Sequence, residues 1–155
     1  MPRPTTSSVG GSRLARSPLA DDLSFLLARA NALAVAEANA ALAEHGLKVR
    51  AFAVLELAAA DTRPSQRELA DFLRLDPSQV VALVDDLQRR GLVERRPDPE
   101  DRRANVVVAT ADGVRVAAAA RVVAEDSERR VHARLSEQER AQLTDMLKRI
   151  ALDEE

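Results

Sequence analysis

Apolar side chains recur every three or four residues along most of the chain, which is the period of an amphipathic α-helix. Ser17 and Pro18 offer an N-cap and a first-turn proline for a long first helix, whose apolar stripe runs towards Leu42 and stops at Gly46. A second, shorter helix is predicted over about residues 48–60. The chain therefore begins with two helices of unequal length.

The next segment predicts two short helices about three residues apart. Ser65 and Glu68 form a capping box, because each side chain can accept the other residue's backbone N–H. Asp76 and Pro77 then supply the N-cap and first position of a helix that ends at Gly91. Two short helices in close succession are typical of a helix-turn-helix.

A β-hairpin and two further helices complete the pattern. Strands are predicted over residues 92–96 and 105–109, separated by a charged loop that contains prolines. Thr110 caps a helix that runs to about residue 133, and residues 136–139 form a capping box for a last helix. The predicted fold class is mostly α with a small β-hairpin.

Composition limits these elements to one domain of ordinary size. The 155 residues are 46% hydrophobic but only 2% aromatic, so aliphatic side chains on helices must form the core. The absence of cysteine excludes disulfides, thiolate metal sites and thiol-based redox sensing, and it suits a reducing cytoplasm. We expect residues 1–16 to be a flexible basic tail rather than a signal peptide or anchor, and we expect no apolar run near the roughly 18 residues of a membrane span.

Charge is unevenly distributed along the chain. The formal net charge of −2 argues against nucleic-acid binding. Residues 89–103 nevertheless hold six arginines and four acids, a local charge of +2. Such a run is often only a solvated surface, so charge alone leaves both interpretations open.

The second short helix has two distinct faces. At 100° per residue, the apolar positions that must be buried are Val80, Leu83, Val84 and Leu87. The opposite face and its flanks are small and polar, and the candidate DNA contacts there are Ser78, Gln79, Val81, Ala82 and Arg89. Serine and arginine can bind phosphate, glutamine can read adenine, and valine can touch a thymine methyl group.

These polar residues also have structural interpretations. Gln79 can be the return half of a capping box with Asp76, and Asp85 can form a surface ion pair with Arg89. Asp85 would be repelled by phosphates unless an arginine pairs with it or it accepts from cytosine N4. The pattern leaves open whether it faces DNA.

The loop of the hairpin ends in Asp101, Arg102 and Arg103. An arginine at such a tip can enter the narrow minor groove, and Asp101 can orient it. A soluble loop without a ligand is the structural alternative.

Residues 65–113 resemble the winged helix-turn-helix of the MarR (multiple antibiotic resistance regulator) family. The most specific segments are GLVER at 91–95, DPEDRR at 98–103 and VVVATADG at 106–113, in the order and spacing of the family. With the flanking helices, the resemblance extends over about residues 17–152. It implies that the helix at 77–90 is the recognition helix.

The resemblance also implies an arrangement of the whole chain. Residues 48–110 would be the DNA-binding region, and residues 17–47 and 111–155 the helical dimerisation region. Arg103 would be the wing arginine in the minor groove, with Asp101 as its partner and Arg102 as second choice. The implied function is a cytoplasmic, homodimeric transcription regulator that binds a pseudo-palindromic operator, usually as a repressor.

Family members commonly bind a small aromatic or phenolic anion, so the resemblance implies an effector of this kind. His45, Arg50 and Phe52 lie near the expected cleft between the first two helices. Each also has a structural interpretation, since Phe52 suits a core and His45 a helix end.

Two other classes of protein are considered. The chain has no cysteine nucleophile or glycine-rich phosphate loop, and His45 and His132 lack partners at helical spacing, so we expect no enzyme, no metal site and no cofactor. The alternative to a regulator is a winged-helix protein–protein interaction module without specific DNA binding. A shallow salt dependence would distinguish that module from a DNA-binding protein.

Overall fold

The computed structural model describes residues 13–152 and divides the chain into two compact units, Met1–Leu33 and Ala34–Glu155, which are considered separately. Residues 1–12 of the predicted basic tail lie outside the described residues. Arg13–Arg16 form a 3-10 turn.

The long first helix begins later than predicted. A second 3-10 turn, Pro18–Asp21, precedes helix α1, Leu23–Leu42. The Oδ1 atom of Asp22 accepts a backbone N–H of the first turn of α1 at 2.7 Å. The expectation that Ser17 caps this helix is therefore wrong, because its hydroxyl donates instead to the carbonyl of Leu14 at 2.7 Å.

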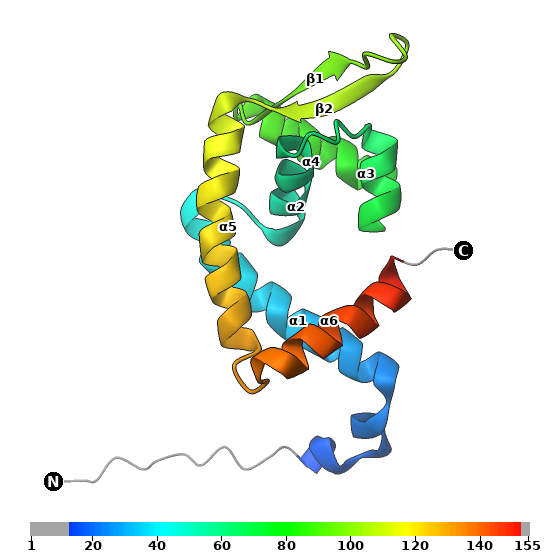
Figure 1. Ribbon diagram of the computed structural model, residues 1–155, viewed down its shortest axis with the longest axis vertical. Coiled ribbons are helices and arrows are strands. Elements are labelled where there is room, and N and C mark those ends of the chain that lie inside the picture. The colour runs from blue at the N-terminus through cyan, green and yellow to red at the C-terminus, as the bar shows by residue number, and fades with distance from the viewer. Residues whose placement is uncertain (1–12, 153–155) are drawn as a thin grey trace, which may run out of the picture. The chain divides into compact units, whose positions relative to one another are not determined.

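The second unit holds the C-terminal part of α1, the remaining helices and a hairpin (Figure 1). Its further elements are a 3-10 turn (Ala43–His45), α2 (Val49–Ala59), α3 (Gln66–Leu73), α4 (Pro77–Arg89), β1 (Val93–Pro97), β2 (Asn105–Ala109), α5 (Ala111–Val131) and α6 (Glu137–Ala151). The described residues are thus mostly helical with one two-stranded sheet, which confirms the predicted fold class.

An aliphatic core positions α4 within the second unit. Helix α2 packs against α4, α5 and β2, while α3 packs against α4. Leu55, Val84 and Val107 are among the largest fully buried side chains of this core. Since α4 contributes only one face to the core, its other face is left open.

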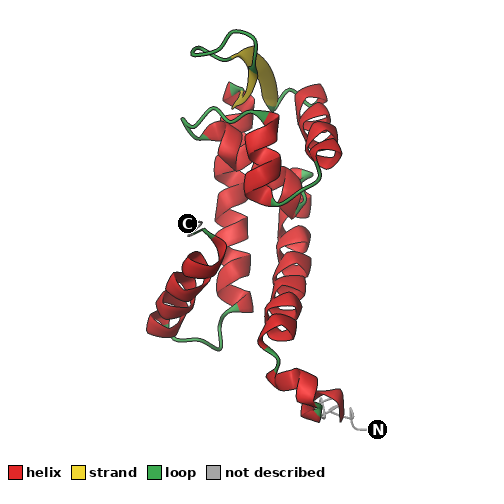
Figure 2. Ribbon diagram, turned by 90° about the vertical axis from the view of Figure 1, so that its right-hand side faces the viewer, coloured by secondary structure: helices red, strands yellow, loops and turns green. Residues whose placement is uncertain are grey.

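The hairpin is antiparallel and joined to the start of α3. Strand β1 starts one residue later than predicted, at Val93, which pairs with Ala109. The preceding residue, Leu92, instead donates its N–H to a carbonyl of α4 at 2.9 Å. A single β-bridge between Ser65 and Val106 ties β2 to the start of α3. In Figure 2 the two strands, coloured yellow, lie at one end of this unit and their connecting loop extends outwards.

Two helices leave apolar surface uncovered. Helix α6 has no buried residue and exposes Met146 and Ile150. The stretch Leu23–His45 is long and apolar enough to cross a membrane by length and composition, with a mean hydropathy of 1.2. Arg29 and Glu37 interrupt its apolar residues, so it contains no uninterrupted apolar run of about 18 residues.

Candidate nucleic-acid interface

Helix α4 begins with a capping box formed by Asp76 and Gln79. The Oδ1 atom of Asp76 accepts the N–H of Ser78 at 2.8 Å and its hydroxyl at 2.5 Å. In return, Gln79 Oε1 accepts the N–H of Asp76 at 3.3 Å. The hydrogen bonds from the Ser78 hydroxyl and then its backbone N–H hold the pKa of the Asp76 carboxyl below its ordinary value. The capping interpretation of Gln79 is therefore confirmed.

One face of α4 is buried and the other is open, as its sequence predicts. Val80, Val84 and Leu87 are fully buried, and Leu83 packs against the same core. The exposed positions include all the predicted contacts on this helix: Ser78, Gln79, Val81, Ala82 and Arg89. Short side chains occupy most of this face, so nothing bulky prevents its approach to a major groove about 12 Å wide.

The predicted ion pair between Asp85 and Arg89 is not formed. Arg89 Nη1 lies 3.3 Å from Asp86 Oδ1, and the Asp85 carboxylate accepts a hydrogen bond from Arg95 Nη2 at 2.6 Å. A spacing of four residues allows the first pair, but the packing of β1 against α4 brings Arg95 to Asp85. Asp85 is therefore paired within the protein.

Arg95 joins three elements through its side chain. Its Nε donates to Gln66 Oε1 on α3 at 2.9 Å, and its Nη1 donates to Gln88 Oε1 on α4 at 2.7 Å, besides the bond to Asp85. In the sequence, Arg95 stands out only as part of a basic run. Strand alternation could have identified it, because Arg95 faces the same side as the buried Val93, towards the helices.

The loop of the hairpin, or wing, is held by backbone hydrogen bonds. The N–H of Asp98 donates to the carbonyl of Ala104 at 2.9 Å, and the Asp101 carboxylate accepts the backbone N–H of Arg103 at 3.0 Å. Asp101 thus contacts the backbone of Arg103 rather than its guanidinium group. Arg102 and Arg103 are exposed, and within residues 13–152 neither guanidinium group has a partner.

The three predicted ligand contacts have different surroundings. Phe52 packs against the hydrophobic core, and His45 has a buried Nε2 atom without a hydrogen-bond partner among the described residues. Arg50 lines a hollow of about 450 Å³ that Gln79 and Ala82 also line. Arg50 therefore does not line the expected cleft between the first two helices. It lines a hollow between α2 and the flank of α4.

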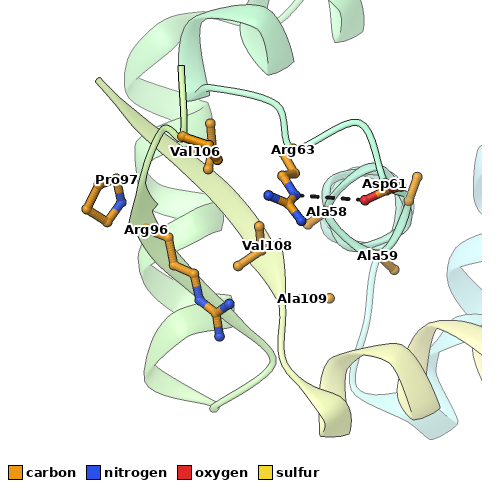
Figure 3. A pocket seen from close by; sticks show the side chains of 11 residues that line it. Ala58, Ala59, Asp61, Arg63, Arg96, Pro97, Val106, Val108 and Ala109 are labelled. Atoms are coloured by element: carbon orange, nitrogen blue, oxygen red, sulfur yellow. Dashed lines mark ion pairs between the residues drawn. The ribbon is translucent and has the colours of Figure 1, made fainter. Parts of the chain in front are cut away.

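A second hollow, of about 330 Å³, lies between the hairpin and the end of α2. Figure 3 shows Arg63 and Arg96 on its wall. Arg63 lies 3.8 Å from Asp61, and Arg96 pairs with Glu94. Each of these two arginines therefore lies beside an acidic residue, whereas the guanidinium groups of Arg102 and Arg103 have no partner among the described residues.

The arrangement of α3, α4 and the hairpin defines a class of domain. Two helices joined by a short turn are followed by a hairpin with exposed arginines, and the second helix keeps one face open. This is a winged helix-turn-helix, a DNA-binding domain whose second helix enters the major groove.

Comparison with known proteins identifies the family. A sequence model of the MarR family matches residues 45–104. A protein of Thauera aromatica, named as a transcriptional regulatory protein for the hcr operon, is 30% identical over 138 residues, which are 88% of this chain and 83% of that protein. The chain belongs to the MarR family of transcriptional regulators.

Solved structures agree with this assignment. CouR from Rhodococcus jostii RHA1, solved bound to p-coumaroyl-CoA, is 38% identical with a TM-score of 0.81, over 88% of this chain and 96% of CouR. The Mycobacterium tuberculosis protein Rv2887 in complex with DNA is 28% identical with a TM-score of 0.69, over 83% of this chain and 97% of that one. Rv2887 in complex with salicylic acid is 29% identical with a TM-score of 0.70, over 84% of this chain and 98% of that one.

Proposed function

We propose that the protein is a homodimeric repressor that binds a pseudo-palindromic operator in the cytoplasm. The observation that carries the proposal is one domain with both an open face on α4 and two exposed arginines, Arg102 and Arg103, on the wing. Arginines at phosphates supply affinity, and a helix in the major groove supplies sequence specificity. The DNA complex of Rv2887 supports the same function.

In this proposal α4 lies in the major groove and the wing reaches the minor groove. Val81 and Ala82 contact thymine methyl groups. The Ser78 hydroxyl donates to Asp76, so its oxygen is left to accept from an amino group on a base edge. Arg103 enters the minor groove, with Asp101 holding its backbone in place. The wing thus contributes affinity, and α4 contributes most of the sequence preference.

The remaining predicted contacts have supporting roles. Gln79 uses its Oε1 in the cap, so it offers its amide N–H groups to DNA. Arg89, at the end of α4, reaches a phosphate, and Arg102 binds a second phosphate beside the wing.

We also propose that an aromatic acid or its coenzyme A thioester releases the protein from DNA. CouR was solved with p-coumaroyl-CoA and Rv2887 with salicylic acid. Here Arg50 places a cation on the hollow beside α4, next to the apolar side chains of Ala51 and Leu83. An anion bound there would contact the recognition helix directly.

Fluorescence anisotropy at several salt concentrations tests the proposal. The wild-type protein should bind DNA from upstream of its own gene tightly and with a steep salt dependence, and unrelated DNA weakly. Arg103→Ala should weaken binding by roughly tenfold and reduce the salt slope by about two, because each subunit of the dimer loses one phosphate-neutralising charge. Addition of p-coumaroyl-CoA or salicylate should release the DNA.

Arg129→Ala is the matched control. Arg129 is also exposed but lies near the end of α5 and pairs with Asp126, so its removal should leave binding unchanged. Weak binding with a flat salt slope for the wild type would favour the protein–protein interaction module. Equal losses for both variants would show that the wing arginine has no specific role.

A further inference from the structure

Asp85 is a carboxylate on the open face of α4. It shares this face with Ser78, Ala82 and Arg89, and its side chain is 54% exposed. A negative charge facing a phosphate backbone repels it, and like charges juxtaposed across an interface weaken binding strongly. A recognition helix with this residue therefore needs a means of offsetting the charge.

Arg95 supplies the opposite charge at contact distance. Its Nη2 lies 2.6 Å from Asp85 Oδ1, which is within the range of a charge-assisted hydrogen bond. The bond crosses from β1 to α4, so it directs the carboxylate towards the hairpin side of the helix. Arg95 is only 27% exposed, and partial burial strengthens such a pair relative to an open surface pair.

The guanidinium group of Arg95 is held in place by the protein. Each of its three nitrogens already makes a hydrogen bond, through Gln66 and Gln88 in addition to Asp85. These bonds fix the group between α3, α4 and β1. The exposed wing arginines have no such partners among the described residues, so the two kinds of arginine have different roles.

We propose that Arg95 is a positioning residue for DNA binding, which neutralises Asp85 and holds its carboxylate away from the phosphates. The proposal rests on the proposed function, DNA binding through α4. It assigns to Arg95 an effect on affinity that acts through Asp85 rather than through a contact with DNA.

The test compares Arg95→Gln, Asp85→Asn and the double variant, with the same upstream DNA and the same salt series. Arg95→Gln should weaken binding by about tenfold, because Asp85 is then unpaired at the interface. The double variant has the net charge of the wild type and should recover most of that loss. Asp85→Asn alone should bind at least as tightly as the wild type.

Rescue by the second substitution separates the possible roles of Arg95. If Arg95 contacted DNA or only stabilised the fold, the double variant would bind as weakly as Arg95→Gln, and the proposal would be overturned. Arg96→Gln is the control on the same strand, since Arg96 pairs with Glu94, and it should change binding little.

Arg95→Lys keeps the test valid if the glutamine variant does not fold. Lysine retains the charge beside Asp85 but cannot reproduce all three hydrogen bonds. It should lower the melting temperature while keeping DNA affinity within about threefold of the wild type. A folded lysine variant with a tenfold loss would contradict the proposal. Failure of the wild type to bind any DNA would remove the proposed function itself, whereas normal binding by Arg95→Gln would remove only this inference.

Discussion

Gly113 is a position where close packing leaves no room for a side chain. It lies in the first turn of α5, and a Cβ atom built there would approach the carbonyl oxygen of Leu92 to 1.9 Å. The same contact region is held by Thr110, whose hydroxyl donates to the Gly91 carbonyl at 2.6 Å and accepts the N–H of Gly113 at 3.0 Å. The start of α5 is thus pressed against the segment that leads into β1.

Gly113→Ala should therefore destabilise the protein. In an unobstructed helix, replacing glycine by alanine stabilises by about 0.5–1 kcal/mol. Here the methyl group meets backbone that cannot move freely, and overpacking of this kind costs about 1–3 kcal/mol. Urea denaturation measures the free energy of unfolding, which should be lower for the variant than for the wild type. An increase in stability would show that α5 does not approach Leu92 so closely.

At the level of the elements, capping boxes fix where α3, α4 and α6 begin. All three boxes join an N-cap side chain to the residue three positions later. Hydrogen bonds to the N-cap serines lower the pKa values of Glu68 and Glu139, as bonds to Ser78 lower that of Asp76. These helix starts are therefore sensitive to acid.

Asp76→Asn isolates this effect for α4. Asparagine is an equally good N-cap but does not titrate. Because the pKa of Asp76 is lowered in the folded state, its stabilising contribution is complete above the unfolded value near 3.8 and is lost as the pH falls through the folded value. The melting temperature of the wild type should exceed that of the variant at pH 6, and the difference should shrink below about pH 4. A difference that stays constant down to pH 2.5 would show that the cap does not depend on the charge.

For the whole molecule, exposed apolar residues in both units are consistent with the proposed homodimer. Leu23 and Leu33 are exposed in the first unit, and Leu147, Ile150 and Met146 on α6 are exposed in the second. In the proposed homodimer, exposed apolar residues of this kind would lie at the subunit interface. A two-fold dimer would place two α4 helices in successive major grooves, about 34 Å apart.

Leu147→Glu combined with Ile150→Glu should convert the dimer into a monomer, because buried carboxylates without partners oppose association. Sedimentation equilibrium measures the mass directly. Gln142→Glu, which adds one negative charge at another exposed position of α6, should remain dimeric. If the double variant also stays dimeric, then α6 does not contribute to the interface.

Helix caps and buried faces could be read from the sequence because they depend on neighbours three or four residues away. The Asp76–Gln79 cap and the buried stripe of α4 are of this kind. Local spacing gave the wrong cap for α1. The Ser17 hydroxyl donates to the carbonyl of Leu14, which precedes it in the chain, and Asp22 accepts a backbone N–H of the first turn of α1 instead.

The order of elements, the wing with its arginines and the open face of α4 were determined by the sequence itself, since hydrophobic period, caps and turn residues act locally. Only the tertiary structure decided that Asp85 pairs with Arg95 and that Arg50 lies beside α4. The physical reason is that these contacts join residues of different elements. Their distances depend on how α2, α4 and β1 pack around the common aliphatic core, which no local pattern specifies.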